Sequence, residues 1–238
     1  DKNREAEYIV RAFLNFGDRR ITPAQFFNDT ISDVRRTINC LHAFGVPSSR
    51  IWIELHNEPN LRPEGHGISW ASGDGFGGWL VAVLVAYRAA LPDCKFLYPG
   101  LSPGGDAYAN GVLLRRDSAR FLEGSRFAIS RFDGVGVHCY WSSSYPMSKA
   151  LAHLDSYTSM GKPVWVTEAS NNTRPPAVEP TPRQYADQYV VFLNQLRQRP
   201  SVRGVTFFVA SASNPEFHPE AWVVGGQSKG IAGLIAHA

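Results

Sequence analysis

The sequence is poor in cysteine, with three among 238 residues, Cys40, Cys94 and Cys139. None forms a Cys-x-x-Cys motif, so the signatures of zinc ribbons and thioredoxin-like redox sites are missing. The odd count leaves at least one thiol free, and whether Cys40 pairs with Cys94 stays open. The seven histidines show no metal-ligand spacing. We therefore expect no metal and no cofactor.

Long apolar runs and strong charge are also missing. The longest apolar run, residues 79–86, is far too short to cross a bilayer. The first residues lack the apolar segment of a signal peptide, so we expect a soluble protein of undetermined compartment with no membrane partner. A net charge of +3 is too small to indicate a nucleic-acid partner.

The sequence does contain apolar and aromatic residues in a regular order. With 44% hydrophobic and 12% aromatic residues, it can form a sizeable core. Short β-rich runs alternate with segments of helical periodicity, which predicts parallel strands joined by right-handed crossovers. The expected strands are 7–13, 51–55, 95–98, 132–140, 164–167 and 205–209, and the expected helices are 22–44, 79–91, 111–122, 147–160, 181–198 and 230–238.

This alternation fits either a doubly wound sheet or a (β/α)8 barrel, and no linker divides the chain, so we expect one domain over residues 1–238. Gly73, Gly75 and Gly78 at the start of a helix, with Asp93 further on, formally match a dinucleotide-binding fingerprint. No convincing strand precedes these glycines. A nucleotide-binding protein is therefore the weakest of the interpretations considered.

Two glutamates follow expected strands and decide between the folds. Glu58, in Asn57-Glu58-Pro59-Asn60, comes shortly after strand 51–55, and Glu168 directly follows strand 164–167. Ligands of α/β folds bind at the carboxyl ends of parallel strands. A pair of carboxylates there suits glycoside hydrolysis, in which one group is protonated and the other ionised.

Polar and aromatic residues near these strand ends extend the predicted site. Asn57 could bind a sugar hydroxyl, and His138 and Tyr140 face the same side of an extended strand. A hydrogen bond donated by the Tyr140 hydroxyl would favour the ionised form of a neighbouring carboxylate. Flat apolar faces that suit sugar rings are offered by Trp141, Trp222 and Phe208.

One further carboxylate, Glu54, shares a strand face with His56 and Glu58. Its position within the strand predicts a buried structural group, which would need a cationic partner. Arg11 is the natural candidate, either as that partner or as a substrate-binding residue, and the sequence leaves both roles open.

The run from Ile53 to Asn60 resembles the fourth-strand signature of clan A glycoside hydrolases, a superfamily of retaining (β/α)8 enzymes. By this resemblance Asn57 binds substrate, Glu58 is the general acid/base and Glu168 is the nucleophile. His138 and Tyr140 resemble the sixth strand, whose tyrosine orients the nucleophile, and residues 206–211 resemble the eighth. His56 stands where many relatives carry an aromatic residue, so it joins the candidate substrate-binding residues.

The resemblance implies a retaining hydrolase of β-linked oligo- or polysaccharides. The alternative is a carbohydrate-binding barrel with little or no turnover, which would keep the aromatic platforms without a competent carboxylate pair. Both interpretations predict a carbohydrate partner.

The position of Glu58 also predicts an incomplete barrel. If Glu58 ends strand four, three β/α units should precede it, and residues 1–57 hold one convincing strand and one helix. We therefore expect a TIM-type (β/α)8 barrel without its first two units, with strands three to eight present. Unpaired sheet edges would favour self-association or completion by an N-terminal segment outside this sequence.

Overall fold

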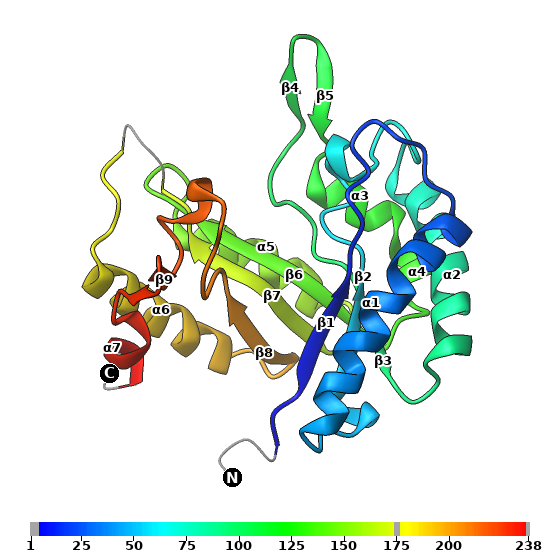
Figure 1. Cartoon of the computed structure of the whole chain (residues 1–238). Coiled ribbons are helices and arrows are strands. Elements are labelled where there is room, and N and C mark those ends of the chain that lie inside the picture. The colour runs from blue at the N-terminus through cyan, green and yellow to red at the C-terminus, as the bar shows by residue number, and fades with distance from the viewer. Residues whose placement is uncertain (1–4, 174–176, 237–238) are drawn as a thin grey trace. The chain divides into compact units, whose positions relative to one another are not determined.

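The computed structural model describes residues 5–173 and 177–236, and the chain divides between Gly136 and Val137 into two compact units (Figure 1). Unit 1 precedes this point and unit 2 follows it. The expectation of one domain over the whole chain stays a prediction.

Parallel strands form the centre of unit 1. The middle strand, β2, pairs with β1 on one side and with β3 on the other. All five residues of β2 are buried, as is typical of a parallel strand covered on both faces. The first residues of β6 pair in parallel with β3. The bounds are β1 (Tyr8–Ala12), β2 (Ile51–Leu55), β3 (Lys95–Tyr98) and β6 (Gly134–Trp141).

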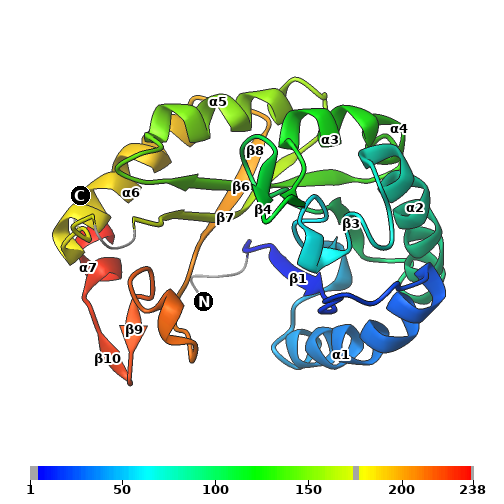
Figure 2. The same ribbon diagram turned by 90° about the horizontal axis from the view of Figure 1, so that it is seen from above.

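Two long helices cover these strands on their outer side (Figure 2). They are α1 (Pro23–Ala43) and α2 (Gly73–Ala90). The expected start of α1 is confirmed: Thr22 caps it, Pro23 is its first residue, and Gln25 completes a capping box with Thr22. Its buried side chains are spaced by four, so one face of the helix packs inward: they are Phe26, Thr30, Val34 and Ile38.

Helix α2 begins six residues earlier than its apolar pattern suggested, with Ser72 as its cap. A Cβ on Gly73 would lie 1.9 Å from the carbonyl oxygen of Phe121, so this glycine permits close packing of two backbones. No strand lies between β2 and α2; that segment contains a 3-10 turn and isolated bridges. The dinucleotide-binding interpretation of these glycines is therefore wrong.

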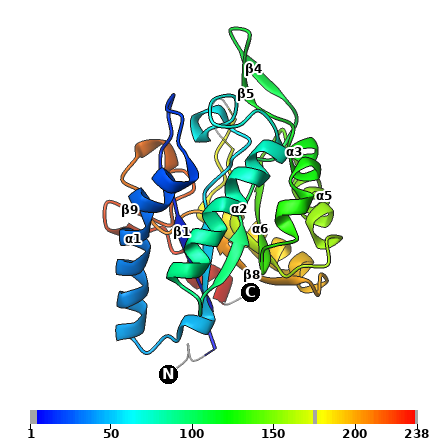
Figure 3. The ribbon, with the colours of Figure 1, turned by 90° about the vertical axis from the view of Figure 1, so that its right-hand side faces the viewer.

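The helix expected at residues 111–122 is confirmed only in its last part, since residues 112–115 form a strand and the helix begins at Ser118. This region begins with an antiparallel hairpin of β4 (Ala107–Ala109) and β5 (Val112–Arg115), followed by α3 (Ser118–Gly124) and α4 (Arg126–Ile129). Asn110 and Gly111, at φ +49° and +74°, form its two-residue turn. Asn-Gly is the strongest short hairpin signal, because both residues tolerate positive φ. Figure 3 shows this hairpin projecting beyond the helices of unit 1.

Unit 2 contains the rest of β6, then β7 (Val164–Asn171) and β8 (Val202–Phe207), with β7 and β8 parallel. Helix α5 (Met147–Thr158) buries Leu154 and Tyr157, and α6 (Pro182–Arg197) starts with the expected Thr181 capping box. The smaller elements are η3 (Pro215–Phe217), the antiparallel pair β9 (Val223–Val224) and β10 (Gln227–Ser228), and α7 (Ile231–Ala236).

The six strands expected from the sequence are therefore all present, in the order β1-β2-β3-β6-β7-β8. This α/β arrangement is consistent with a partial TIM-type barrel. Cys40, Cys94 and Cys139 are free thiols, so the question of a Cys40–Cys94 pair is answered in the negative. Within the described residues, none of the helices has the length and apolarity needed to span a membrane.

Candidate active site

Glu58 lies in a tight turn that follows β2, and its backbone is held on both sides. The Glu58 amide donates a hydrogen bond to the carbonyl oxygen of Gly100 at 3.0 Å, and its own carbonyl accepts one from the Leu61 amide at 2.8 Å. Glu58 has φ +38°, in the left-handed region that costs a residue other than glycine free energy. Such conformations persist where the surroundings impose them, often at functional sites.

The last residue of the Asn57–Asn60 motif has a structural role that its sequence context did not reveal. Asn60 is fully buried, and its side-chain amide donates to the carbonyl oxygens of Ser102 and Arg116 at 2.8 and 3.0 Å. Its Oδ1 accepts from the Ser102 amide at 2.9 Å. In addition, the Trp70 indole donates to the Pro59 carbonyl at 2.8 Å. These bonds fix the turn that presents Asn57 and Glu58.

Asn57 is partly buried at this turn. Its Oδ1 has no hydrogen-bond partner among the residues that the structure describes. A buried amide oxygen without a partner is costly, and a ligand hydroxyl would satisfy it. This observation agrees with a substrate-binding role for Asn57.

Glu54 is the buried structural carboxylate that the sequence predicted, and Arg11 is its partner. Arg11 Nε donates to Glu54 Oε2 at 2.8 Å, with the Glu54 side chain 1% exposed. Glu54 Oε1 accepts from the Gly100 amide at 3.1 Å. Because the Gly100 carbonyl accepts from the Glu58 amide, one residue links the buried ion pair to the candidate catalytic turn. Gly100 was not identified from the sequence, although its position two residues after the end of β3 was a signal that could have suggested it.

Gly136 provides the space for the Glu54 carboxylate, and we expect Gly136→Ala to destabilise the fold. An added Cβ would lie 2.5 Å from Glu54 Oε1 and 3.1 Å from both the Gly100 nitrogen and the Tyr98 oxygen. Overpacking of this kind costs about 2 kcal/mol in free energy of unfolding. Denaturant titration measures this loss.

The matched control is Gly78→Ala in α2, where a Cβ would meet nothing within 4 Å. Replacing an exposed helical glycine with alanine should raise the free energy of unfolding by up to about 1 kcal/mol. Equal stability of Gly136→Ala and the wild type would contradict the tight packing around Glu54.

His56, a candidate substrate-binding residue, is instead fully buried in the core of unit 1. Its ring lies 4.8 Å from that of Phe16, between ring centroids, and its other neighbours include the rings of Phe26 and Trp70. Its Nε2 donates to the Glu64 carbonyl oxygen at 2.7 Å. His56 therefore packs as an aromatic residue, at the position where the resembled family often carries one.

Burial lowers the pKa of His56 to about 4; the hydrogen bond to the Glu64 carbonyl opposes this change, and the charge of Arg11 adds to it. Because the pKa in the unfolded chain is about 6.5, the unfolded state takes up the proton first as the pH falls. The stability contributed by neutral His56 is complete above about pH 6.5 and is lost as the pH falls to about 4, by about 3 kcal/mol.

We therefore expect His56→Phe to reduce the fall in unfolding free energy between pH 7 and pH 4.5 relative to the wild type. Denaturant unfolding at the two pH values measures this difference. An unchanged slope in His56→Phe would show that His56 does not titrate as its burial implies.

Glu168 is the central polar group of unit 2. The Tyr140 hydroxyl donates to Glu168 Oε2 at 2.6 Å, and His138 Nδ1 lies 3.5 Å from the same oxygen. The Glu168 side chain is 12% exposed, and that of His138 is fully buried. A short hydrogen bond from a hydroxyl stabilises the ionised carboxylate. The structure thus brings together three of the residues predicted from the sequence.

Glu168 lies within β7 rather than after it, at an irregularity of the strand. Val166 pairs with Val205 of β8, and Ala169 pairs with Phe207, so β7 has one residue more than its partner in this interval. This is a β-bulge, a feature that redirects a side chain and is frequent beside active sites. The Thr206 hydroxyl donates to the Thr167 carbonyl and holds the bulge in place.

The aromatic candidates of unit 2 lie in two different environments. Trp141 is 3% exposed, donates from Nε1 to Gln188 Oε1 at 2.7 Å, and packs against Phe192 of α6. Trp222 is half-buried against the rings of Tyr189 and Phe207. Both therefore contribute to packing around α6.

Phe208 packs directly against the ring of Tyr140. Its ring centroid lies 6.1 Å from that of Tyr140, at an interplanar angle of 72°. Phe207 precedes it and packs toward α6 with Tyr189, at 4.3 Å between ring centroids. Of the three predicted sugar platforms, Phe208 is thus the one in contact with Tyr140, the hydrogen-bond donor to Glu168.

Comparison with known proteins gives one family-model match and several solved structures of similar fold. Residues 119–226 match the family model described as glycosyl hydrolase catalytic core. This range includes His138, Tyr140 and Glu168, and it begins after Glu58, which lies outside it. A search of curated proteins gives no match.

Several solved glycoside hydrolases have a similar fold. A GH128 (subgroup II) endo-β-1,3-glucanase from Sorangium cellulosum superposes with a TM-score of 0.64 at 16% identity, over 98% of this chain and 80% of that chain. A GH128 (subgroup I) endo-β-1,3-glucanase from Amycolatopsis mediterranei, in complex with laminaritriose and laminaribiose, gives 0.60 at 14% identity, over 98% and 83%. The GH39 enzyme from Xanthomonas axonopodis pv. citri gives 0.59 at 14% identity, over 90% and 45%. The family match supports a glycoside hydrolase, and the solved structures show a similar fold.

Proposed function

We propose that the protein is a retaining glycoside hydrolase that cleaves β-1,3-linked glucan, with Glu168 as nucleophile and Glu58 as general acid/base. The observation that carries this proposal is the Glu168 carboxylate on its β-bulge, with the Tyr140 hydroxyl 2.6 Å away. The family match includes this group. The substrate class is suggested by similarity to structures that are described as endo-β-1,3-glucanases.

In the first step a Glu168 oxygen attacks the anomeric carbon, and the bond between that carbon and the glycosidic oxygen breaks. Glu58 transfers its proton to the departing oxygen. The Tyr140 hydrogen bond holds the Glu168 carboxylate ionised and oriented before attack. The products of this step are a covalent glycosyl-enzyme and the released saccharide, on which the former glycosidic oxygen is now a hydroxyl group.

In the second step Glu58, now a carboxylate, takes a proton from water as the water oxygen bonds to the anomeric carbon. Glu168 leaves as a carboxylate, which restores the enzyme. Asn57 binds a substrate hydroxyl through its buried Oδ1. This mechanism requires carboxyl groups about 5–5.5 Å apart, whereas an inverting mechanism requires about 6.5–9.5 Å.

The test is hydrolysis of a panel of soluble glucans, measured as the release of reducing ends. We expect release from β-1,3-glucan and none from α-1,4-glucan. Binding to β-1,3-glucan without release of reducing ends would favour the carbohydrate-binding alternative. Hydrolysis of a different β-linked polysaccharide would keep the mechanism and replace the substrate.

A further inference from the structure

The β4–β5 hairpin of unit 1 has an unusual composition for an exposed element. Between Ala107 and Leu114 it carries no charged residue. Three large apolar side chains are exposed: Tyr108 by 64%, Val112 by 41% and Leu114 by 39%. A two-stranded ribbon with apolar side chains in solvent is at most marginally stable alone, and exposed apolar groups of this kind mark interaction sites.

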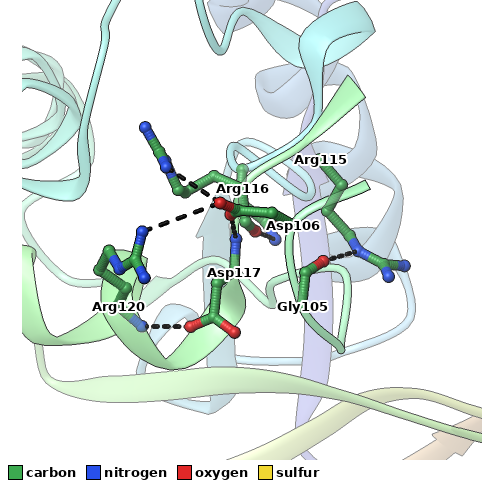
Figure 4. Close-up of polar contacts among 7 residues, drawn as sticks. Gly105, Asp106, Arg115, Arg116, Asp117 and Arg120 are labelled. Carbon is green, nitrogen blue, oxygen red and sulfur yellow. Dashed lines mark hydrogen bonds and ion pairs between the residues drawn. The ribbon is translucent and has the colours of Figure 1, made fainter. Parts of the chain in front are cut away.

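A network of charged residues makes the base of the hairpin rigid (Figure 4). Asp106 accepts from the Asp117 amide at 2.6 Å and from Arg116 Nη1 at 3.2 Å, and Arg120 Nη1 lies 3.8 Å from the same carboxylate. The Asp117 amide is the main cause of a lowered pKa at Asp106. Arg115 Nε donates to the Gly105 carbonyl at 3.0 Å and closes the other side.

This base is joined directly to the turn that carries Glu58. The Arg116 amide donates to the Asn60 carbonyl at 2.9 Å, and the Asn60 side chain donates to the Arg116 carbonyl at 3.0 Å. Leu61 and Arg115 also form an antiparallel bridge. The hairpin is therefore a rigid extension of the Asn57–Asn60 segment, and both belong to unit 1.

We propose that the β4–β5 hairpin binds the polysaccharide chain outside the cleavage site, with Tyr108 as its stacking surface. Pyranose rings present flat faces of C–H groups, which pack on aromatic rings, while the phenol hydroxyl stays in solvent. Tyr108 and Leu113 are register partners, so they share one face of the hairpin. Continuity with the Asn57–Asn60 turn favours the substrate over a partner protein. This inference rests on the proposed function.

The rigid base suits this role. A loop ordered before binding loses little conformational entropy when the glycan docks, so a single aromatic side chain can contribute measurably to affinity. The type I′ geometry expected of an Asn-Gly turn likewise fixes the strands relative to each other.

The experiment compares Tyr108→Ala, Tyr108→Phe and Phe44→Ala, each with and without Glu168→Gln. Phe44 is 87% exposed and follows α1, so it controls for loss of a surface aromatic. In the Glu168→Gln background, titration with β-1,3-gluco-oligosaccharide should show affinity reduced about tenfold by Tyr108→Ala and little changed by the other two. With Glu168 present, Tyr108→Ala should raise KM on the polymer and leave kcat/KM on a small aryl β-glucoside unchanged.

Wild-type affinity in Tyr108→Ala would overturn the proposal, as would an equal loss on the polymer and the aryl glucoside. A change of oligomeric state in light scattering with unchanged glycan affinity would identify a self-association surface instead. Absence of hydrolysis by the wild type together with reduced binding by Tyr108→Ala would refute the proposed function alone. Far-ultraviolet circular dichroism and thermal unfolding verify that the variants are folded.

Discussion

Glu168→Gln is expected to lower kcat on β-1,3-glucan by at least about a thousandfold. The amide keeps the size of the carboxylate, and its oxygen can still accept the Tyr140 hydrogen bond that is 2.6 Å long in the wild type. The nucleophile is lost while the surrounding geometry is preserved. Reducing-end assays measure the loss, and thermal unfolding should be close to that of the wild type.

Tyr140→Phe serves as the graded comparison for this variant. It removes one hydrogen bond to Glu168 and leaves the ring that contacts Phe208. Loss of a hydrogen bond to a charged group corresponds to about a tenfold to hundredfold decrease in kcat. Retention of a tenth or more of wild-type activity in Glu168→Gln would exclude Glu168 as nucleophile.

Glu58→Ala is expected to lose about a thousandfold in kcat/KM on β-1,3-glucan, because the leaving oxygen of a sugar needs a proton. The loss should be much smaller on an aryl glycoside with an acidic phenol, for which departure needs little assistance. Azide, a small anion that needs no general base, should then accelerate turnover and yield a β-glycosyl azide. Kinetics with and without azide, with product analysis by NMR, measure these effects.

Asp74→Ala is the control for Glu58→Ala, since Asp74 is an exposed carboxylate in the first turn of α2 of the same unit. It should keep wild-type activity and show no response to azide. A Glu58→Ala variant that is fully active, or an inactive one that azide does not rescue on the activated substrate, would remove Glu58 from the mechanism.

Features that depend on short sequence patterns were predictable. The capped starts of α1 and α6 follow from Thr-Pro pairs, and the expected parallel strands follow from runs of β-branched residues. Strand alternation and the cost of burying an unpaired carboxylate predicted a buried Glu54 with a cationic partner. They made Arg11 the candidate, and the structure decided between its two possible roles. Each of these rules concerns neighbouring residues or a single physical requirement.

Features that depend on tertiary packing were not predictable in the same way. The bulge that carries Glu168 is a register difference between β7 and β8, which neither strand encodes alone. His56 and Trp141 are residues of types common in binding sites, and their burial is decided by the aromatic residues around them. The β4–β5 hairpin differs from both cases. Asn110-Gly111 is a typical hairpin turn sequence and could have predicted it, but the apolar pattern of the following residues favoured a helix.

The stereochemistry of the product tests the central claim most directly. Proton NMR recorded immediately after the enzyme is mixed with a β-1,3-gluco-oligosaccharide identifies the anomer released first, before mutarotation. A double displacement through Glu168 predicts the β-anomer first, with the α-anomer growing later. Initial release of the α-anomer would contradict the nucleophilic role of Glu168 and indicate an inverting enzyme.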